Sequence, residues 1–227
     1  MKIAIILYGP PGSGKSTQAN LLSQKLDLIY FDTGRLLESI VHDPKRERDP
    51  VIRRERKLFD SGRLLTPSFV FKEVARHVKV IADAGWGIVF SGSPRTLSEA
   101  EGLFPILERL YGKKGIVTFI LEIPERASVE RNSRRLVCKI CGAPLLTAYY
   151  PSKHPKHCPV CAGPLYKRTL DDPATIRVRL EEYRERTKPI FEFMRAKGLK
   201  IKKVDGTKAP YKVFQVVYDS VKNTRPH

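Results

Sequence analysis

The segment Gly9–Thr17 constrains the fold of this chain more than any other feature of its sequence. It reads Gly-Pro-Pro-Gly-Ser-Gly-Lys-Ser-Thr and matches the pattern G-x-x-x-x-G-K-[ST]. The preceding run, Ile3–Tyr8, is almost entirely apolar, as expected of a parallel strand buried on both faces. A helix is predicted to follow. In this setting glycines let backbone N–H groups turn toward phosphate oxygens, and the helix adds its positive end. The segment therefore predicts a phosphate-binding loop.

Individual residues of this loop have separate predicted roles in binding ATP. Lys15 is expected to reach the β- and γ-phosphates, and Ser16 to offer its hydroxyl to Mg²⁺. The remaining ATP-binding candidates form the backbone cradle and the start of the helix: Gly9, Gly12, Ser13, Gly14 and Thr17. The alternative is a glycine-rich turn with an incidental lysine. The loop alone does not distinguish a kinase from a GTPase or an ATPase.

Apolar segments that resemble the first strand recur along the chain and alternate with predicted helices. The further strands are predicted at 28–31, 87–90, 116–121 and 199–204. The helices are predicted at 67–81 after a Thr66 cap, at 98–111 from a capping box of Ser98 and Glu101, at 124–135, at 172–197, and after Pro210. This alternation predicts an α/β fold with a doubly wound, five-stranded parallel sheet.

Two segments do not fit the alternation and are predicted to be insertions on one core. Residues 35–66 are densely charged and contain no strand pattern, and residues 137–167 contain the cysteines together with Pro, Gly and Tyr. The core domain is then expected to comprise residues 1–34, 67–136 and 168–227.

Composition limits the class of protein and the nature of its partners. Hydrophobic residues make up 41 % of the 227 and charged residues 29 %, which argues against wholesale disorder. No apolar run approaches the roughly 20 residues that span a bilayer, and no secretion signal is recognised, so a cytoplasmic protein is expected. The net charge of +18 favours an anionic partner, either a nucleotide or a nucleic acid. The alternative is a lysine-rich surface that only confers solubility.

The four cysteines form two Cys-x-x-Cys pairs separated by sixteen residues: Cys138, Cys141, Cys158 and Cys161. Four thiolates complete the tetrahedral shell of Zn²⁺, so the pattern predicts a structural zinc site. His154 and His157, between the pairs, are interpreted as loop residues. The alternative is four free buried cysteines. Tyr149, Tyr150, Lys153 and Lys156 would suit a nucleic-acid-binding knuckle, or a basic lid over a triphosphate.

Further motifs follow the predicted strands and insertions in a recognisable order. They are Asp32-Thr33-Gly34-Arg35, Ser61-Gly62-Arg63-Leu64-Leu65-Thr66, Gly92-Ser93-Pro94-Arg95-Thr96, Val129-Glu130-Arg131 with Arg134-Arg135, and Val204-Asp205-Gly206-Thr207. Together with the phosphate-binding loop, the set resembles the adenylate kinase family of nucleoside monophosphate kinases over nearly the whole chain. The resemblance implies transfer of the γ-phosphoryl group of ATP to a nucleoside monophosphate, with Mg²⁺. It also implies that residues 35–66 bind the monophosphate and that residues 137–167 form a zinc-bearing lid.

The resemblance implies roles for individual residues. Arg95 would hold the phosphate of the acceptor, Arg131 would lie over the base of ATP, and Arg168 and Arg179 would contact the transferred phosphoryl group. Arg135 would be the phosphate-binding residue at the lid hinge, or Arg134 if one residue has been deleted. The catalytic set implied is Lys15, Arg95, Arg135, Arg168 and Arg179, and the acceptor would also meet Thr33, Gly34, Arg35, Gly92 and Glu99.

The chain departs from the family pattern at several of these positions. Glu38 replaces an arginine that grips the acceptor's phosphate, and Arg35, one helical turn earlier, is expected to substitute. Arg35 and Ser91 stand where aspartates lie near the metal, which predicts an unusually high Mg²⁺ requirement because Ser16 and the phosphates would hold the ion. Asp172 is interpreted as a helix cap.

Glu99 stands where a glutamine is expected to recognise the acceptor's base. An ionised carboxylate offers only hydrogen-bond acceptors, which suit the two adjacent donors of guanine better than adenine. This predicts a preference shifted from AMP toward GMP. The alternative is that Glu99 only complements the dipole of the helix whose first turn it occupies.

Two other functions compete with a nucleoside monophosphate kinase. One is a nucleotide-binding module with weak or no kinase activity that binds RNA or a ribosomal surface, favoured by the charge and the missing carboxylates. The other is a kinase with a non-nucleotide phosphate acceptor. ATP, Mg²⁺ and a panel of monophosphates would discriminate among them.

Overall fold

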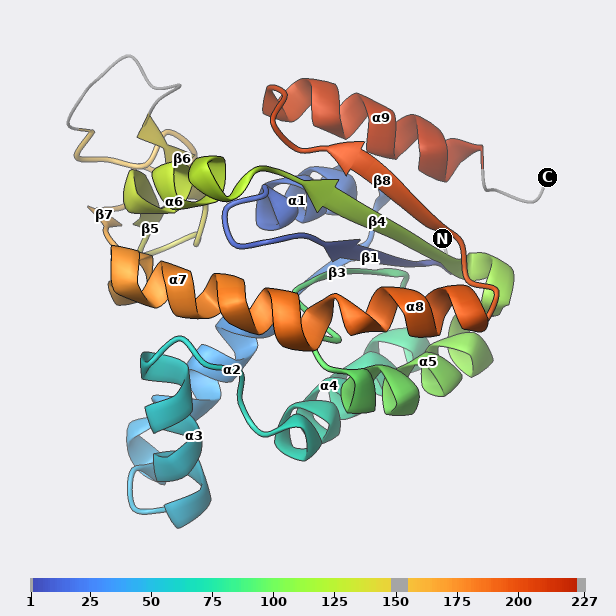
Figure 1. The fold of residues 1–227 in the computed structure, drawn as a ribbon, viewed down its shortest axis with the longest axis horizontal. Coiled ribbons are helices and arrows are strands. Elements are labelled where there is room, and N and C mark those ends of the chain that lie inside the picture. The colour runs from blue at the N-terminus through green and yellow to red at the C-terminus, as the bar shows by residue number, and fades with distance from the viewer. Residues whose placement is uncertain (1, 148–154, 224–227) are drawn as a thin grey trace.

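The computed structural model describes residues 2–147 and 155–223, and its centre is a parallel sheet of five strands (Figure 1). The strands are β1 (Ala4–Tyr8), β2 (Ile29–Asp32), β3 (Ile88–Ser91), β4 (Ile116–Glu122) and β8 (Ile201–Asp205). They lie in the order β2-β3-β1-β4-β8, which confirms the predicted doubly wound sheet. The chain order reverses beside β1, and ligands of such sheets bind at this point, beyond the carboxyl ends of the strands.

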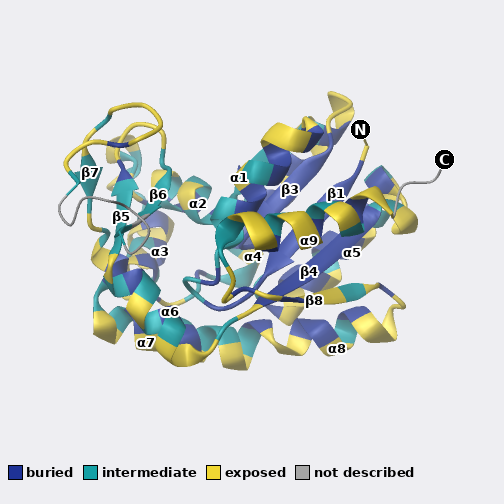
Figure 2. Ribbon diagram, turned by 90° about the horizontal axis from the view of Figure 1, so that it is seen from above, coloured by how far each residue is buried: buried dark blue, intermediate teal, exposed yellow. Residues whose placement is uncertain are grey.

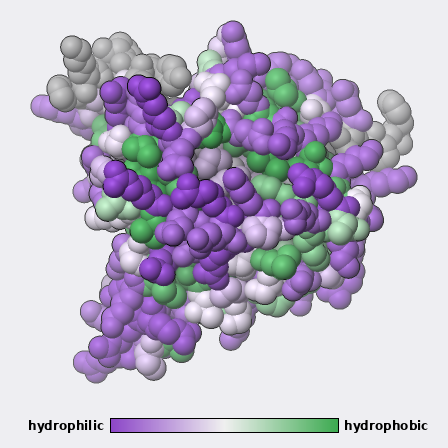
Figure 3. Space-filling model, in the orientation of Figure 1, coloured by the Kyte–Doolittle hydropathy of each residue, from purple (hydrophilic) through white to green (hydrophobic). Residues whose placement is uncertain are grey.

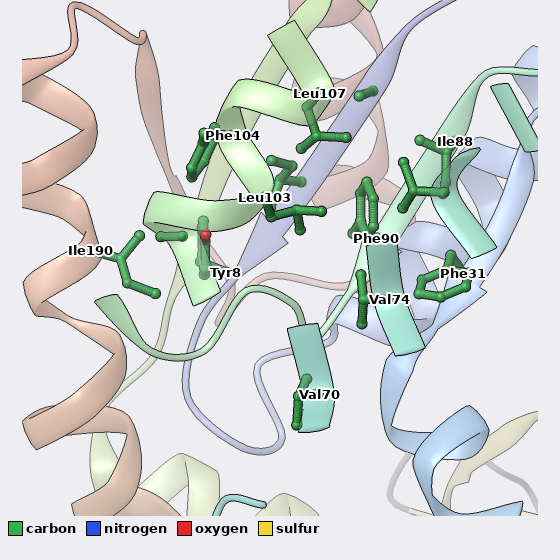
Figure 4. Packing of buried hydrophobic residues seen from close by; sticks show 14 of the residues in the cluster. Tyr8, Phe31, Val70, Val74, Ile88, Phe90, Leu103, Phe104, Leu107 and Ile190 are labelled. Carbon is green, nitrogen blue, oxygen red and sulfur yellow. The ribbon is translucent and has the colours of Figure 1, made fainter. Parts of the chain in front are cut away.

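Helices cover both faces of the sheet (Figures 1 and 2). On one face, α1 (Lys15–Leu26) and α9 (Pro210–Lys222) bury side chains that include Leu7 and Phe119. On the other face, α4 (Pro67–Asp83), α5 (Leu97–Tyr111) and α8 (Pro189–Ala196) pack around Phe90, as Figure 4 shows. Because successive residues of a strand face opposite sides, β1, β3 and β4 supply both cores and are buried almost throughout, whereas the edge strand β2 is partly exposed.

The predicted helix at 172–197 is interrupted in the structure. It is divided into α7 (Pro173–Glu182), a π-helical turn (Tyr183–Thr187) and α8. Pro189 is the physical cause, since it has no N–H and its ring cannot sit against the carbonyl four residues earlier. The chain widens before it, and the N–H of Lys188 donates to the carbonyl of Tyr183, five residues back, at 3.0 Å. The wider turn lets the Thr187 hydroxyl donate to the carbonyl of Arg95 at 2.9 Å.

Two helix starts use other contacts than those predicted. At α5 the capping box consists of Thr96 and Glu99 rather than Ser98 and Glu101, because Thr96 Oγ1 accepts the N–H of Glu99 at 3.3 Å. At α4, Thr66 is in the N-cap position, but its hydroxyl donates to the buried carboxylate of Glu55 at 2.6 Å. Asp172 does cap α7, accepting the N–H groups of the two residues after Pro173.

The first insertion is helical and projects from the core (Figure 1). It contains α2 (Thr33–Val41), a 3₁₀ turn (Pro44–Arg46) and α3 (Pro50–Asp60). The surface over it is mostly hydrophilic (Figure 3).

The second insertion follows α6 (Glu125–Ser133) and contains a small antiparallel sheet in the order β6-β5-β7. Its strands are β5 (Arg135–Cys138), β6 (Pro144–Leu146) and β7 (Leu165–Tyr166). Outside this insertion, 3₁₀ turns occupy Lys113–Gly115 before β4 and Thr169–Asp171 before α7. Tyr149, Tyr150, Lys153 and His154 lie outside the described residues. Within the described ranges, no helix has the length and apolar character needed to cross a membrane.

Candidate active site

One large cleft lies between the core and the two insertions, and it brings together nearly all of the predicted site residues. Its volume, including the part at the mouth that is open to solvent, is about 1820 Å³. The loop Gly9–Thr17 forms its floor, and every other predicted ATP- or acceptor-binding residue except Arg35 lines it. Residues from separate parts of the chain thus converge beyond the carboxyl ends of the strands, as the topology requires.

The phosphate-binding loop is held in shape by Lys15 and by glycines. Lys15 Nζ donates to the carbonyls of Gly9 at 2.7 Å and Pro10 at 2.9 Å. Gly9 has a φ of 147°, and a Cβ there would lie 2.5 Å from the carbonyl oxygen of Leu121, so only glycine fits. Burial, with Arg95, Arg179 and Arg135 nearby, lowers the pKa of Lys15 well below its ordinary value. The cleft is therefore rich in positive charge and suited to a polyanion.

A buried aspartate fixes two of the cleft's arginines. Asp171 is completely buried, and its two oxygens accept from Arg135 at 2.5 and 3.0 Å. Arg179 donates to Asp171 Oδ1 at 3.4 Å and to the carbonyl of Leu170 at 3.1 Å. Arg134 instead points to solvent and pairs with Glu130 at 3.2 Å. Of the two residues left open at the lid hinge, the structure places Arg135 in the cleft.

At the end of the cleft near α6, Arg131 joins two segments of the core. Its guanidinium donates to the carbonyls of Gly206 at 2.7 Å and Thr207 at 3.0 Å, in the loop after β8. Asn132 and Lys208 also line this end of the cleft. Asn132 Oδ1 is buried and has no hydrogen-bond partner among the described residues.

The opposite end of the cleft combines polar groups with apolar walls. Arg95 Nε donates to the carbonyl of Gly92 at 2.7 Å, and burial lowers the pKa of Arg95. Thr33 Oγ1 is buried without a partner among the described residues. The apolar walls are Leu37, Phe59, Leu64, Leu65 and Val70.

The carboxylate of Glu99 is committed to the start of α5. Oε2 accepts the N–H of Arg95 and Oε1 accepts the hydroxyl of Thr96, each at 2.9 Å. Burial raises the pKa of Glu99, and these two hydrogen bonds oppose the rise. Its position therefore has a structural explanation, although the residue also lines the cleft.

Arg35 lies elsewhere than expected. It does not line the cleft, and its guanidinium donates instead to the carbonyl of Cys141 in the second insertion at 3.4 Å. Arg35 lies in the first turn of α2, and its long side chain reaches the second insertion rather than the phosphate-binding loop. The expectation that Arg35 replaces the arginine missing at Glu38 is not supported by this placement.

Several cleft residues carry no predicted role. Asp32, Arg63, Asn132 and Lys208 line the cleft, and each adjoins or belongs to a motif quoted above. In the sequence, the only indication of a role for these residues is that they lie in or beside a motif. That position does not show which side chains point into the cleft.

The four cysteines form a cluster that fits a metal ion. The Sγ atoms of Cys138 and Cys161 are 3.5 Å apart, those of Cys141 and Cys158 are 3.6 Å apart, and all four lie within 4.8 Å of one another. Tetrahedral zinc, with Zn–S bonds of about 2.3 Å, separates its sulfurs by about 3.8 Å. The cluster could hold such an ion. His157 bonds to the carbonyl of Ala162 at 3.2 Å, in keeping with its interpretation as a loop residue.

The fold and the cleft define a phosphate-binding-loop protein that binds nucleotides and is arranged for phosphoryl transfer. Comparison with known proteins gives the family. The profile of the family described as adenylate kinase matches residues 7–199. An adenylate kinase of Caldicellulosiruptor bescii is 36 % identical over 195 residues, covering 86 % of this chain and 88 % of the relative. One of Archaeoglobus fulgidus is 32 % identical over 222 residues, covering 96 % and 99 %.

An adenylate kinase of Clostridium botulinum is 32 % identical over 210 residues, covering 92 % of this chain and 94 % of the relative. The chain belongs to the adenylate kinase family. The family resemblance is thus confirmed, and with it phosphoryl transfer between ATP and a nucleoside monophosphate.

Proposed function

We propose that the chain is an ATP:AMP phosphotransferase. The observation that carries the choice of acceptor is the engagement of Glu99 with Arg95 N–H and the Thr96 hydroxyl. Because these contacts account for an acidic residue at this position, the argument for guanine loses its basis. The names of the relatives at 32–36 % identity also support AMP as the acceptor.

In the proposed reaction, an oxygen of the AMP phosphate attacks the γ-phosphorus of ATP. The bond between that phosphorus and the β–γ bridging oxygen breaks, and two molecules of ADP form. Such a transfer needs alignment and charge neutralisation more than covalent catalysis. Lys15, Arg135, Arg168 and Arg179 would neutralise the charge on the transferred group, and Arg95 would fix the acceptor's phosphate. Mg²⁺, bound with ATP, would draw charge from its β- and γ-phosphates, with Ser16 as its ligand from the loop.

Zinc is proposed as the ion of the cysteine cluster, since four sulfur ligands at tetrahedral spacing suit it. It would leave no position for water, so its role would be structural. We further propose that residues 35–66 bind the monophosphate and that residues 137–167 form the lid.

The acceptor is tested by kcat/KM for AMP, GMP, UMP and CMP in the parent, in Glu99→Gln and in Glu101→Gln. Glu101 is the matched control because it is exposed on the same helix. AMP is expected to be preferred by about tenfold or more, which corresponds to about 1.4 kcal/mol, in all three proteins. A parent that prefers GMP, with the preference reversed only in Glu99→Gln, would contradict AMP as the acceptor.

A different pair of results distinguishes the proposed enzyme from a nucleotide-binding module with weak or no kinase activity that binds RNA or a ribosomal surface. Such a module would bind RNA with an affinity that falls steeply with salt and would form no diphosphate from any of the four monophosphates. The proposed enzyme forms ADP whether or not its basic surface also attracts RNA.

A further inference from the structure

The metal-binding end of the cleft has a hydroxyl where the family pattern has a carboxylate. Ser91 ends β3, and its Oγ lies 3.2 Å from Oγ of Ser16. Magnesium in such sites keeps several water molecules, and carboxylates hold these waters in place. A hydroxyl at 91 can accept a hydrogen bond from a water but brings no negative charge, so the charge must come from elsewhere.

Asp32 supplies a carboxylate at the same level of the sheet, one strand away. It ends β2 and is in direct register with Ser91. Paired residues of adjacent parallel strands lie about 4.8 Å apart with side chains on the same face. Leu7 of β1 is in register with Ser91 on the other side of β3, and its side chain packs on the face of the sheet that α1 covers. Asp32 and Ser91 therefore face α1, whose first turn carries Ser16. Asp32 also lines the cleft.

Tyr30 connects this carboxylate with the two serines. It lies two residues before Asp32 and therefore shares its face of β2. Its hydroxyl donates to Asp32 Oδ2 at 2.9 Å. Burial and then the charge of Asp32 raise the pKa of Tyr30, while hydrogen bonding with Ser16 and Ser91 opposes the rise. One phenol thus lies among the carboxylate and both hydroxyls, which shows that the four side chains converge.

Asp32 retains the capacity to hold water. Oδ1 accepts the N–H of Arg35 at 3.1 Å and so caps α2, and Oδ2 accepts from Tyr30. Each carboxylate oxygen has two lone pairs, so each can accept one more hydrogen bond. Among the described residues, two other carboxylates line the cleft, and neither is paired with Ser91 in the sheet: Glu99 lies in the first turn of α5, and Glu182 lies in α7 and pairs with Arg186 at 3.3 Å.

We propose that Asp32 is the positioning residue for magnesium in this chain, holding metal-bound water from β2 in place of the aspartate that Ser91 replaces on β3. The proposal rests on the proposed function in that the metal arrives with ATP. It revises the expectation of a high Mg²⁺ requirement, because the negative charge has moved by one strand and has not been lost.

Metal binding without turnover tests this proposal. Full-length protein is saturated with the β,γ-imido analogue of ATP, and the dissociation constant of Mn²⁺ in the ternary complex is measured by electron paramagnetic resonance. The variants are Asp32→Ser, Asp32→Ser with Ser91→Asp, and Asp172→Ser. Serine retains an N-cap at α2, so the first variant removes the carboxylate and leaves the helix start. Asp172→Ser is the matched control, since Asp172 caps α7 and does not line the cleft.

Asp32→Ser is expected to raise the Mn²⁺ dissociation constant by about tenfold. This is the typical effect of removing a group that hydrogen-bonds to a ligand of the metal. Ser91→Asp in that background is expected to restore most of the loss, and Asp172→Ser to change it by less than twofold. An unchanged constant in Asp32→Ser would overturn the proposal. So would an equal loss of metal-free analogue binding, because Asp32 would then support the loop and not the metal. Since no step requires AMP or turnover, failure of the proposed acceptor would leave this result interpretable.

Discussion

The carboxylate of Glu38 on α2 lies 3.3 Å from the guanidinium of Arg168, although the two residues are 130 positions apart. Arg168 lines the cleft, where the family pattern assigns it to the transferred phosphoryl group. Arg168 is therefore paired with a carboxylate at the place where it lines the cleft. A phosphate must displace this carboxylate, or share the arginine with it.

Removing the charge of Glu38 should strengthen ATP binding. Partly exposed ion pairs contribute about 0.2–1 kcal/mol, so Glu38→Gln is expected to lower the dissociation constant of ATP by about 1.4- to fivefold. Glu130→Gln is the matched control, because Glu130 pairs with Arg134 outside the cleft. Isothermal titration gives the constants. Weaker binding in Glu38→Gln, or an equal gain in both variants, would show that the pair does not compete with phosphate.

Arg134 and Arg135 are neighbours in sequence with opposite surroundings, which makes them a matched pair. Arg135→Ala is expected to lower kcat/KM by about 10²–10³-fold, the usual cost of losing one donor to a developing charge. Arg134→Ala is expected to stay within twofold. Thermal unfolding must accompany the kinetics, because Arg135→Ala also leaves the fully buried Asp171 with a weaker partner. Comparable losses of kcat/KM in the two variants would contradict the prediction that Arg135, and not Arg134, contacts phosphate.

One zinc ion per chain is expected in protein purified under reducing conditions. A small insertion buries little apolar surface, so metal binding should supply much of its folding free energy. In Cys138→Ser, amides of residues 135–147 and 155–166 should lose protection from hydrogen exchange, while amides of β1, β3 and β4 should keep theirs. His157→Ala should retain the metal and the protection. Metal analysis that finds no zinc in the reduced parent would refute the site.

Nucleotide binding should take up a proton at Lys15. Its pKa is lowered in the free protein by burial and by nearby arginines, and a bound triphosphate raises it again. Between these two pKa values, binding is coupled to uptake, so ATP affinity should fall as pH rises through this window. Titration above about pH 8, in buffers with different ionisation enthalpies, measures the uptake without interference from the phosphate's own titration. Lys15→Arg keeps the charge but does not titrate, so uptake that is equal in this variant would assign the proton to another group.

Local patterns predicted the parts of the fold that depend on local chemistry. The central strands β1, β3 and β4 are evident from short apolar runs, because strands buried on both faces are apolar almost throughout, whereas the edge strands β2 and β8 are only partly buried. The cysteine spacing predicts the cluster, since two cysteines that are only three positions apart in the chain can both contact one metal ion. Pro189 was also visible in the sequence, but its effect depends on whether the helix stops or widens there, and packing of Ile190 and Met194 against the core favours widening.

Side-chain partners that come from distant segments could not be predicted in this way. Thr66 was a reasonable N-cap, yet its hydroxyl bonds to Glu55, which lies on another helix. The sequence leaves both base recognition and a role at the helix start open for Glu99, and only the folded chain shows that its carboxylate accepts from Arg95 N–H and the Thr96 hydroxyl. Asp32 had no predicted role because its significance comes from register with Ser91, nearly sixty residues later. The residue types were informative, but their neighbours depend on tertiary structure.

The account depends most directly on transfer of the γ-phosphoryl group of ATP to AMP at Lys15. Purified protein with Mg²⁺, AMP and ATP labelled at the γ-phosphate should form two ADP for each ATP consumed, with label in the β-position of the ADP that derives from AMP. Lys15→Ala should lower the rate by at least about 10²-fold, because Lys15 is proposed to neutralise charge on the transferred group. Hydrolysis of ATP to labelled inorganic phosphate without label in ADP, or a rate unchanged in Lys15→Ala, would contradict the account.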